Sequence, residues 1–223
     1  MKKIIATGIF TFLSFFVTAT NAQFGALGSL LGGASSAASG GGVDAQVKSF
    51  VESSNQINSL IFTSLMAINA AYSSAEESAK ISSEVKAFTE ITDPKERAAK
   101  VAEAQKTQTA KLEELIKSKD AVERTQKLDT TKRKQVLDSV GNFAIAGLQA
   151  VKLTATGKSI VSSVTTNPMA LIQIAPVADA LPILASAVST TTDVLPGYYK
   201  ILRGANLEPP KVTAESKPQE VKF

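Results

Sequence analysis

The most constraining feature of this sequence is a long stretch that almost lacks charge. Residues 139–199 contain only four charged side chains, whereas the 55 residues before them, 84–138, contain 24. The four are Lys152, Lys158, Asp179 and Asp193. Exposing the many Ile, Val, Leu and Ala side chains of this stretch to water would forgo much of the burial free energy on which folding depends. The stretch must therefore be covered by the same chain, by another chain or by lipid.

The N-terminus has the three-part pattern of a cleaved secretory signal. Two lysines follow the initiating methionine, residues 4–17 form an uncharged and mostly apolar run, and Thr20-Asn21-Ala22 ends in a small side chain. The run is shorter than the about 20 residues that a membrane-spanning helix needs. We expect a signal peptide over residues 1–22 with cleavage near Ala22, and hence a periplasmic or secreted bacterial protein.

The charge balance argues against a nucleic-acid partner, and the absence of cysteine argues against disulfides and a lipid anchor. Removing the signal peptide deletes two of the 24 basic residues and none of the 20 acidic ones, which leaves the mature chain close to neutral. Basic and acidic residues interleave without forming a basic stripe, so we expect no nucleic-acid partner. The chain has no cysteine, so it has neither disulfides nor a lipid-modified cysteine to hold it at a membrane.

Helical periodicity dominates residues 44–204, which we expect to form one domain. Apolar residues recur at steps of three and four over residues 47–91, which predicts one long helix capped by Asp44. A more charged helix is expected to start at the Asp93 cap and Pro94, and to run to about Leu128. No segment makes a convincing strand. The sequence therefore predicts an all-α fold, an elongated antiparallel helical bundle of long helices with coiled-coil-like stripes.

The charge-poor stretch supplies the remaining helices of this prediction. A helix begins after the Asp129 cap, and the small residues over 141–150 permit close contact with another helix. Beyond it, four sites predict interruptions: Gly157, Pro176, Pro182 and Pro196-Gly197. Asn167-Pro168 predicts a new helix start with Asn167 as its cap, and Gly204 predicts the final stop. The uncharged centre of the first helix, residues 60–72, needs cover on more than one face. Burial of the charge-poor stretch by the first helix is therefore the expected arrangement.

Both flanks of the domain have the composition of linkers. Residues 23–43 combine a short apolar peptide, 23–31, with a run of Gly, Ser and Ala. We expect a flexible segment there, with a hydrophobic hook that docks on a partner or a membrane as the alternative. Residues 205–223 carry three prolines among Lys and Glu, and a disordered tail is expected.

The residue types leave little room for catalysis. The chain has no His, Cys or Trp, which removes the commonest general base, the thiolate nucleophile and most transition-metal ligands. We therefore expect no enzyme, no catalytic residue, and no cofactor or metal site. Asp179 is expected to cap a helix starting at Ala180 or to face solvent. The alternative is an ion pair with Lys152 or Lys158 that holds the apolar pieces in register, or a switch if these pieces insert in a membrane.

These features favour a non-enzymatic exported protein that acts as a scaffold, an adaptor or a component of an envelope, surface or secretion structure. Its partners would be proteins, including a second copy of itself. In general plan and length the chain is similar to the minor pilus-tip subunits of conjugative secretion systems, which are exported helical rods; the comparison is one of shape. The alternative is a membrane-active or pore-forming protein that inserts the apolar segment around residues 159–188.

Overall fold

The computed structural model of the protein describes residues 43–163 and 168–221. Within these residues the chain forms six helices and no strand, which confirms the all-α prediction. The helices are α2 (Val43–Tyr72), α3 (Ala75–Glu90), α4 (Pro94–Lys117), α5 (Ala121–Gln126), α6 (Thr130–Ser163) and α7 (Pro168–Gly204). The expected signal peptide, nearly all of the expected linker over 23–43, and the Asn167 cap lie outside the described residues.

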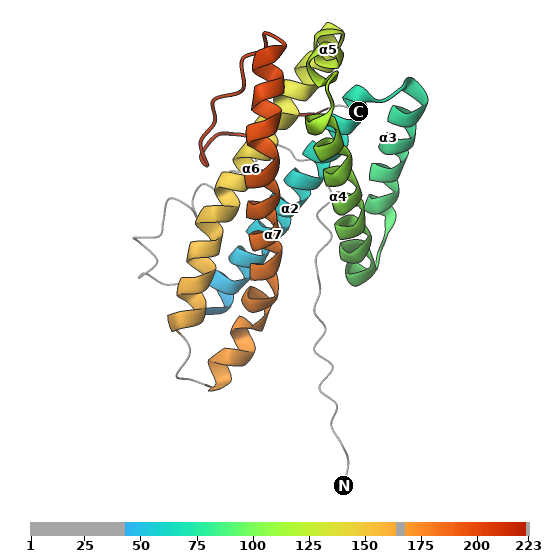
Figure 1. Cartoon of the computed structure of the whole chain (residues 1–223). Coiled ribbons are helices and arrows are strands. Elements are labelled where there is room, and N and C mark those ends of the chain that lie inside the picture. Colours follow the sequence, from blue (N-terminus) through green and yellow to red (C-terminus); the bar gives the residue numbers. More distant parts are fainter. Residues whose placement is uncertain (1–42, 164–167, 222–223) are drawn as a thin grey trace.

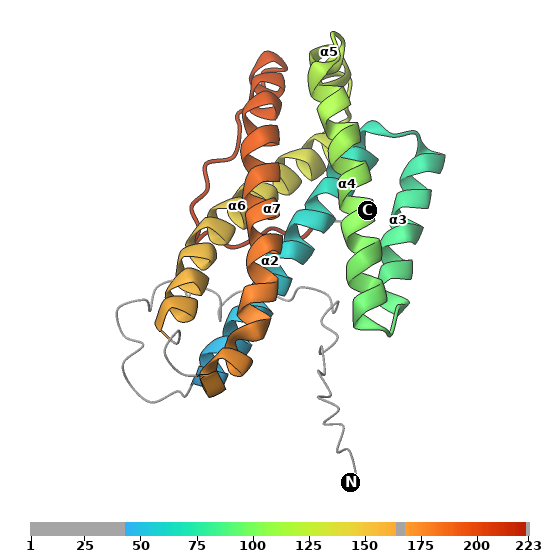
Figure 2. The same cartoon turned by 60° about the horizontal axis from the view of Figure 1, so that its bottom comes forward.

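Three long helices, α2, α6 and α7, pack against one another and form the main body of the bundle (Figure 1). α6 and α7 make an antiparallel hairpin, and α2 runs antiparallel to α6 while contacting both (Figures 1 and 2). α3 and α4 form a second hairpin beside α2, and α5 contacts α7. α2 is therefore the central element, with helices on several sides of it.

The burial of α2 follows from its uncharged centre. Every residue from 60 to 71 except Thr63 is buried. A large hydrophobic cluster joins α2 to α4, α5, α6 and α7. A smaller cluster joins α2 to α3 and α4, where the rings of Phe62 and Phe88 meet edge to face with their centres 5.3 Å apart. The centre of α2 is thus covered on more than one face, as the sequence predicts.

The prediction of one helix over residues 44–91 is wrong, because the chain turns after Tyr72. The Ser74 hydroxyl accepts a hydrogen bond from the backbone N–H of Glu77, and the Glu77 carboxylate accepts one from the backbone N–H of Ser74. This reciprocal capping box starts α3 afresh. The new helix folds back onto α2, which buries Phe88 in the smaller cluster.

Two expected caps are present, and one expected helix is shorter. The backbone N–H of Glu96 donates to Asp93 at 2.7 Å, and that of Lys132 donates to Asp129 at 2.9 Å. Both carboxylates satisfy backbone donors that are free at a helix start. The charged helix that was expected to reach Leu128 ends at Lys117, and α5 follows as a separate short helix.

The predicted interruptions at Gly157, Pro176, Pro182 and Pro196 are wrong: α6 runs through Gly157, and α7 is one helix that contains the three prolines. The predicted start at Pro168 is where α7 begins. A proline inside a helix leaves the carbonyl four residues earlier without its donor. Those carbonyls belong to Ile172, Ala178 and Thr192, which are all exposed residues. Water can therefore satisfy them, while the opposite face of α7 packs on α2 and α6. The expected stop at Gly204 is confirmed.

Candidate functional site

The outward face of α7 carries apolar side chains that the rest of the described chain leaves uncovered. Ile174, Val177 and Leu184 are buried, whereas Ile172 is 74% exposed and Ile183 is 45% exposed. α7 is long and apolar enough to cross a membrane by length and composition alone. Only 28% of its most apolar 18-residue stretch is buried in the structure. Within the charge-poor stretch, residues 139–147 of α6 are all buried, whereas α7 is covered by the described chain on one face only.

Beside this face, α6 and α7 enclose an apolar groove of about 640 Å³. Its α6 wall carries Leu148 and Val151, which are 42% and 53% exposed. Its α7 wall carries Leu195 and Tyr199, both half-buried. Among the residues that line it, Lys211 is the single charged one. The groove therefore suits uncharged, apolar side chains and offers little to a polar ligand.

The groove has a tight floor where two small residues meet. Gly147 of α6 lies against Thr191 of α7, and a Cβ atom added to Gly147 would stand 2.5 Å from the Thr191 hydroxyl oxygen. That hydroxyl donates within its own helix to the carbonyl of Ala187 at 2.9 Å. The expectation that small residues over 141–150 permit close helix contact is confirmed at this crossing.

The third wall of the groove is the C-terminal strap, residues 205–221, which includes Pro210 and Thr213 as groove-lining residues. A disordered tail is expected over these residues, whereas the structure shows a segment that is hydrogen-bonded to α6. The strap first lies near Gly141, where Pro210 contacts α6, and turns at residues 213–216. It then returns along α6 (Figure 1).

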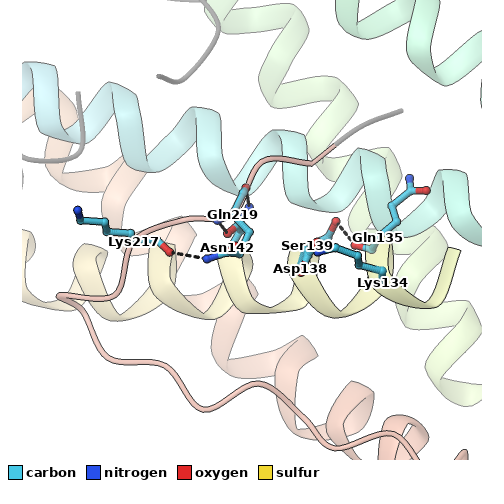
Figure 3. Close-up of polar contacts among 7 residues, drawn as sticks. All are labelled: Lys134, Gln135, Asp138, Ser139, Asn142, Lys217 and Gln219. Carbon is cyan, nitrogen blue, oxygen red and sulfur yellow. Dashed lines mark hydrogen bonds and ion pairs between the residues drawn. The ribbon is translucent and has the colours of Figure 1, made fainter. Parts of the chain in front are cut away.

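Side-chain amides of α6 fix the position of the strap. Asn142 donates to the carbonyl of Gln219 at 2.8 Å and accepts from its backbone N–H at 2.7 Å, so one side chain holds both backbone groups (Figure 3). Gln149 donates to the carbonyl of Ala214 at 3.0 Å. Both side chains are almost completely buried in the structure, so the strap supplies hydrogen-bond partners in place of water.

The charged residues that the sequence singles out are not brought together. Asp179 is exposed in the middle of α7, so the cap at Ala180 is wrong and the solvent-facing alternative is right. Lys152 pairs instead with Glu215 of the strap. The hydrogen bond from Lys152 lowers the pKa of the Glu215 carboxyl below its ordinary value of 4.5. Lys158 is exposed on α6.

A chain of hydroxyl groups that sequence reasoning missed ties α7 to α2 and α5. Tyr198 donates to the Tyr72 hydroxyl at 2.7 Å, and that hydroxyl lies 2.9 Å from the Thr125 hydroxyl. Thr125 donates onward to the carbonyl of Ala121 at 2.8 Å. Burial raises the pKa of Tyr198 well above its ordinary value of 10.0. No sequence pattern signals this contact, because the three residues are far apart in the chain.

Across residues 43–163 and 168–221, no three Asp or Glu side chains gather in a way that could hold a metal ion. The groove has no carboxylate among its lining residues. What the arrangement offers is an open apolar surface next to a strap held by hydrogen bonds. No family model, no curated protein and no solved structure matches this chain.

Proposed function

We propose that the protein is an exported, non-enzymatic helical-bundle protein that acts as a scaffold or adaptor in an envelope, surface or secretion structure. The observation that carries this proposal is the apolar groove with its exposed Leu148 and Val151. The large hydrophobic residues that are exposed in the described chain, Leu148 and Val151 on α6 and Ile172 and Ile183 on α7, all belong to the α6–α7 hairpin. Exposed apolar surface of this kind on a soluble domain is typical of an interaction site.

The distribution of charge supports a protein partner on this side. The solvent-exposed faces of α3 and α4 carry three ion pairs between residues four apart: Lys80 with Glu76 and Lys100 with Glu96, each at 2.8 Å, and Lys117 with Glu113 at 3.4 Å. These faces are well solvated and need no partner. The α6–α7 hairpin lacks comparable pairs over residues 139–163 and 168–199, and the cores of protein interfaces are likewise poor in charge.

The test places a photoreactive amino acid at Leu148 in the groove, in cells that make the protein at its natural level. Asn55, an exposed residue of α2, serves as the matched control position. We expect a discrete adduct with an envelope or surface protein from Leu148 and none from Asn55, and we expect Val151→Asp to abolish it. No adduct, or the same adducts from both positions, would refute the docking role. Mass spectrometry of the mature chain tests export, with loss of residues 1–22 as the expected result.

The alternative function, a membrane-active protein, is favoured by one specific observation: α7 passes the length and composition criterion for a membrane span. Against it, one whole face of α7 packs on α2 and α6, and insertion would have to break those contacts. Three prolines and several Ser and Thr residues of α7 would also need partners in lipid. Leakage from dye-loaded liposomes on adding the purified protein would support this alternative, and intact liposomes would exclude it.

A further inference from the structure

The groove requires an occupant of a particular chemistry. Leu148 and Val151 are about half exposed, and no described segment covers them. An occupant must bring several apolar side chains and no charge, because Lys211 of the strap is the single lining residue that could pair with a charged group. The volume of about 640 Å³ suits a few bulky side chains on a short peptide.

The chain itself contains such a peptide. Residues 24–31 read Phe-Gly-Ala-Leu-Gly-Ser-Leu-Leu, with four large apolar side chains and no charge. The sequence has no charged residue at all between Lys3 and Asp44. Residues 32–42, rich in Gly, Ser and Ala, then join the peptide to the start of α2 at Val43.

The start of α2 lies within reach of the groove. Phe50 of α2 packs against Gly157 of α6, and Val43 lies seven residues farther from the groove, about 10 Å along the helix. Gly157 is six residues from Val151, which adds about 9 Å along α6. The separation along the bundle is therefore about 20 Å, and passing from α2 to the far side of α6 adds at least the width of one helix, about 10 Å.

The length of the connecting segment matches this span. Eleven residues, 32–42, reach at most about 36–40 Å when fully extended. Chains of Gly- and Ser-rich composition with this length have a root-mean-square end-to-end distance of about 17–20 Å. The effective concentration of a tethered group is highest when this distance is close to the span, and it then reaches the millimolar range. Apolar contacts with an intrinsic Kd below about 1 mM would therefore keep the peptide docked.

We propose that residues 24–31 of the same chain occupy the groove between α6, α7 and the strap. The inference rests on the proposed function in that the groove is the docking surface: the tethered peptide is its resident occupant, and an external partner binds by displacing it. The peptide shields Leu148 and Val151 from water until a partner with more apolar contacts arrives.

The test uses disulfide formation, since the natural chain has no cysteine. The full chain is made with its own leader and purified with Ser29→Cys in the peptide and Thr192→Cys at the exposed rim of the groove. The control pairs Ser29→Cys with Asn55→Cys, about 18 Å along α2 from Val43 and equally exposed. After mild oxidation of dilute protein, we expect the groove pair to close at least about tenfold faster than the control pair, within monomers.

A variant of the peptide and the Leu148 photo-adduct distinguish the possible outcomes. Replacing Leu27 and Leu30 with serine in the groove pair should bring its closure rate down to that of the control. Equal rates for the two original pairs, or disulfides formed only between chains, overturn the proposal. If this preference is absent while the Leu148 photo-adduct remains, the inference fails and the proposed function stands. If the preference is present and no adduct forms, the peptide is the occupant and the proposed function fails.

Discussion

Two glycines of α6, six residues apart, allow the close packing of α6 on α7 to be tested directly. Gly147→Ala adds a methyl group 2.5 Å from the Thr191 hydroxyl oxygen and 2.8 Å from the Thr191 Cβ. Gly141→Ala adds the same methyl group at 3.5 Å from Pro210 of the strap, which is an ordinary contact distance. Both sites are buried and helical, so the two substitutions differ mainly in the space available.

The expected magnitudes follow from two opposing terms. Alanine in a helix interior is favoured over glycine by about 0.8–1 kcal/mol at either site. Overpacking at Gly147 costs about 1–3 kcal/mol, because the close atoms include the Cβ of Thr191, which cannot rotate away. Gly141→Ala should therefore stabilise the protein by up to about 1 kcal/mol, and Gly147→Ala should destabilise it by up to about 2 kcal/mol.

Urea unfolding followed by far-UV circular dichroism measures both values. If the free energy of unfolding falls by about 2 kcal/mol per molar urea, the urea concentrations at the unfolding midpoints of the two variants should differ by about 0.5–1.5 M. Equal midpoints, or a Gly147→Ala variant more stable than Gly141→Ala, would show that α6 and α7 do not meet as closely as the structure indicates. The shape of the groove floor would then have to be revised as well.

Three further predictions concern contacts outside this crossing. Tyr198→Phe removes the donor to Tyr72 and should lower the free energy of unfolding by about 0.5–1.5 kcal/mol in the same urea assay. Because burial raises the Tyr198 pKa, the folded state keeps a proton that the unfolded state loses, so stability should fall as pH rises above about 10, and less steeply in the variant. The Glu215 pKa is lowered by the hydrogen bond from Lys152, so that contact should persist above pH 4.5 and weaken as pH falls through the lowered value. The protection of the strap amides, measured relative to the intrinsic exchange rate at each pH, should fall in acid, and Glu215→Gln should remove this pH dependence. Ser74→Ala removes the capping box and should cost about 1 kcal/mol, with exchange rising first at the start of α3.

Local sequence signals predicted some helix starts, at Pro94 and Thr130, and missed others, at Ala75 and Ala121. Asp93 and Asp129 are recognisable as caps, because a carboxylate just before a helical pattern can accept hydrogen bonds from the free backbone N–H groups of the first turn. The break at Ser74 was readable in principle, because serine with Glu77 three residues later is a capping box. It was missed because the apolar periodicity continues across it.

The prolines of α7 show why local rules failed in the charge-poor stretch. Each one opposes helix formation, and together they predict short pieces. In the structure the unpaired carbonyls fall on exposed residues, while Val177, Leu184 and Tyr198 hold the other face against α2 and α6. Helix stability here comes from tertiary packing, and no pattern in the sequence of α7 alone reveals it.

The sequence by itself determined the fold class and the need to cover residues 139–199, because helical spacing and the lack of charge are properties of the chain. Only the tertiary structure decided which face of α7 remains open, and that Asn142, Gln149 and Lys152 hold the strap beside the groove. These contacts join residues more than sixty positions apart. Which residues form these contacts depends on how whole helices pack, and neither composition nor periodicity predicts that packing.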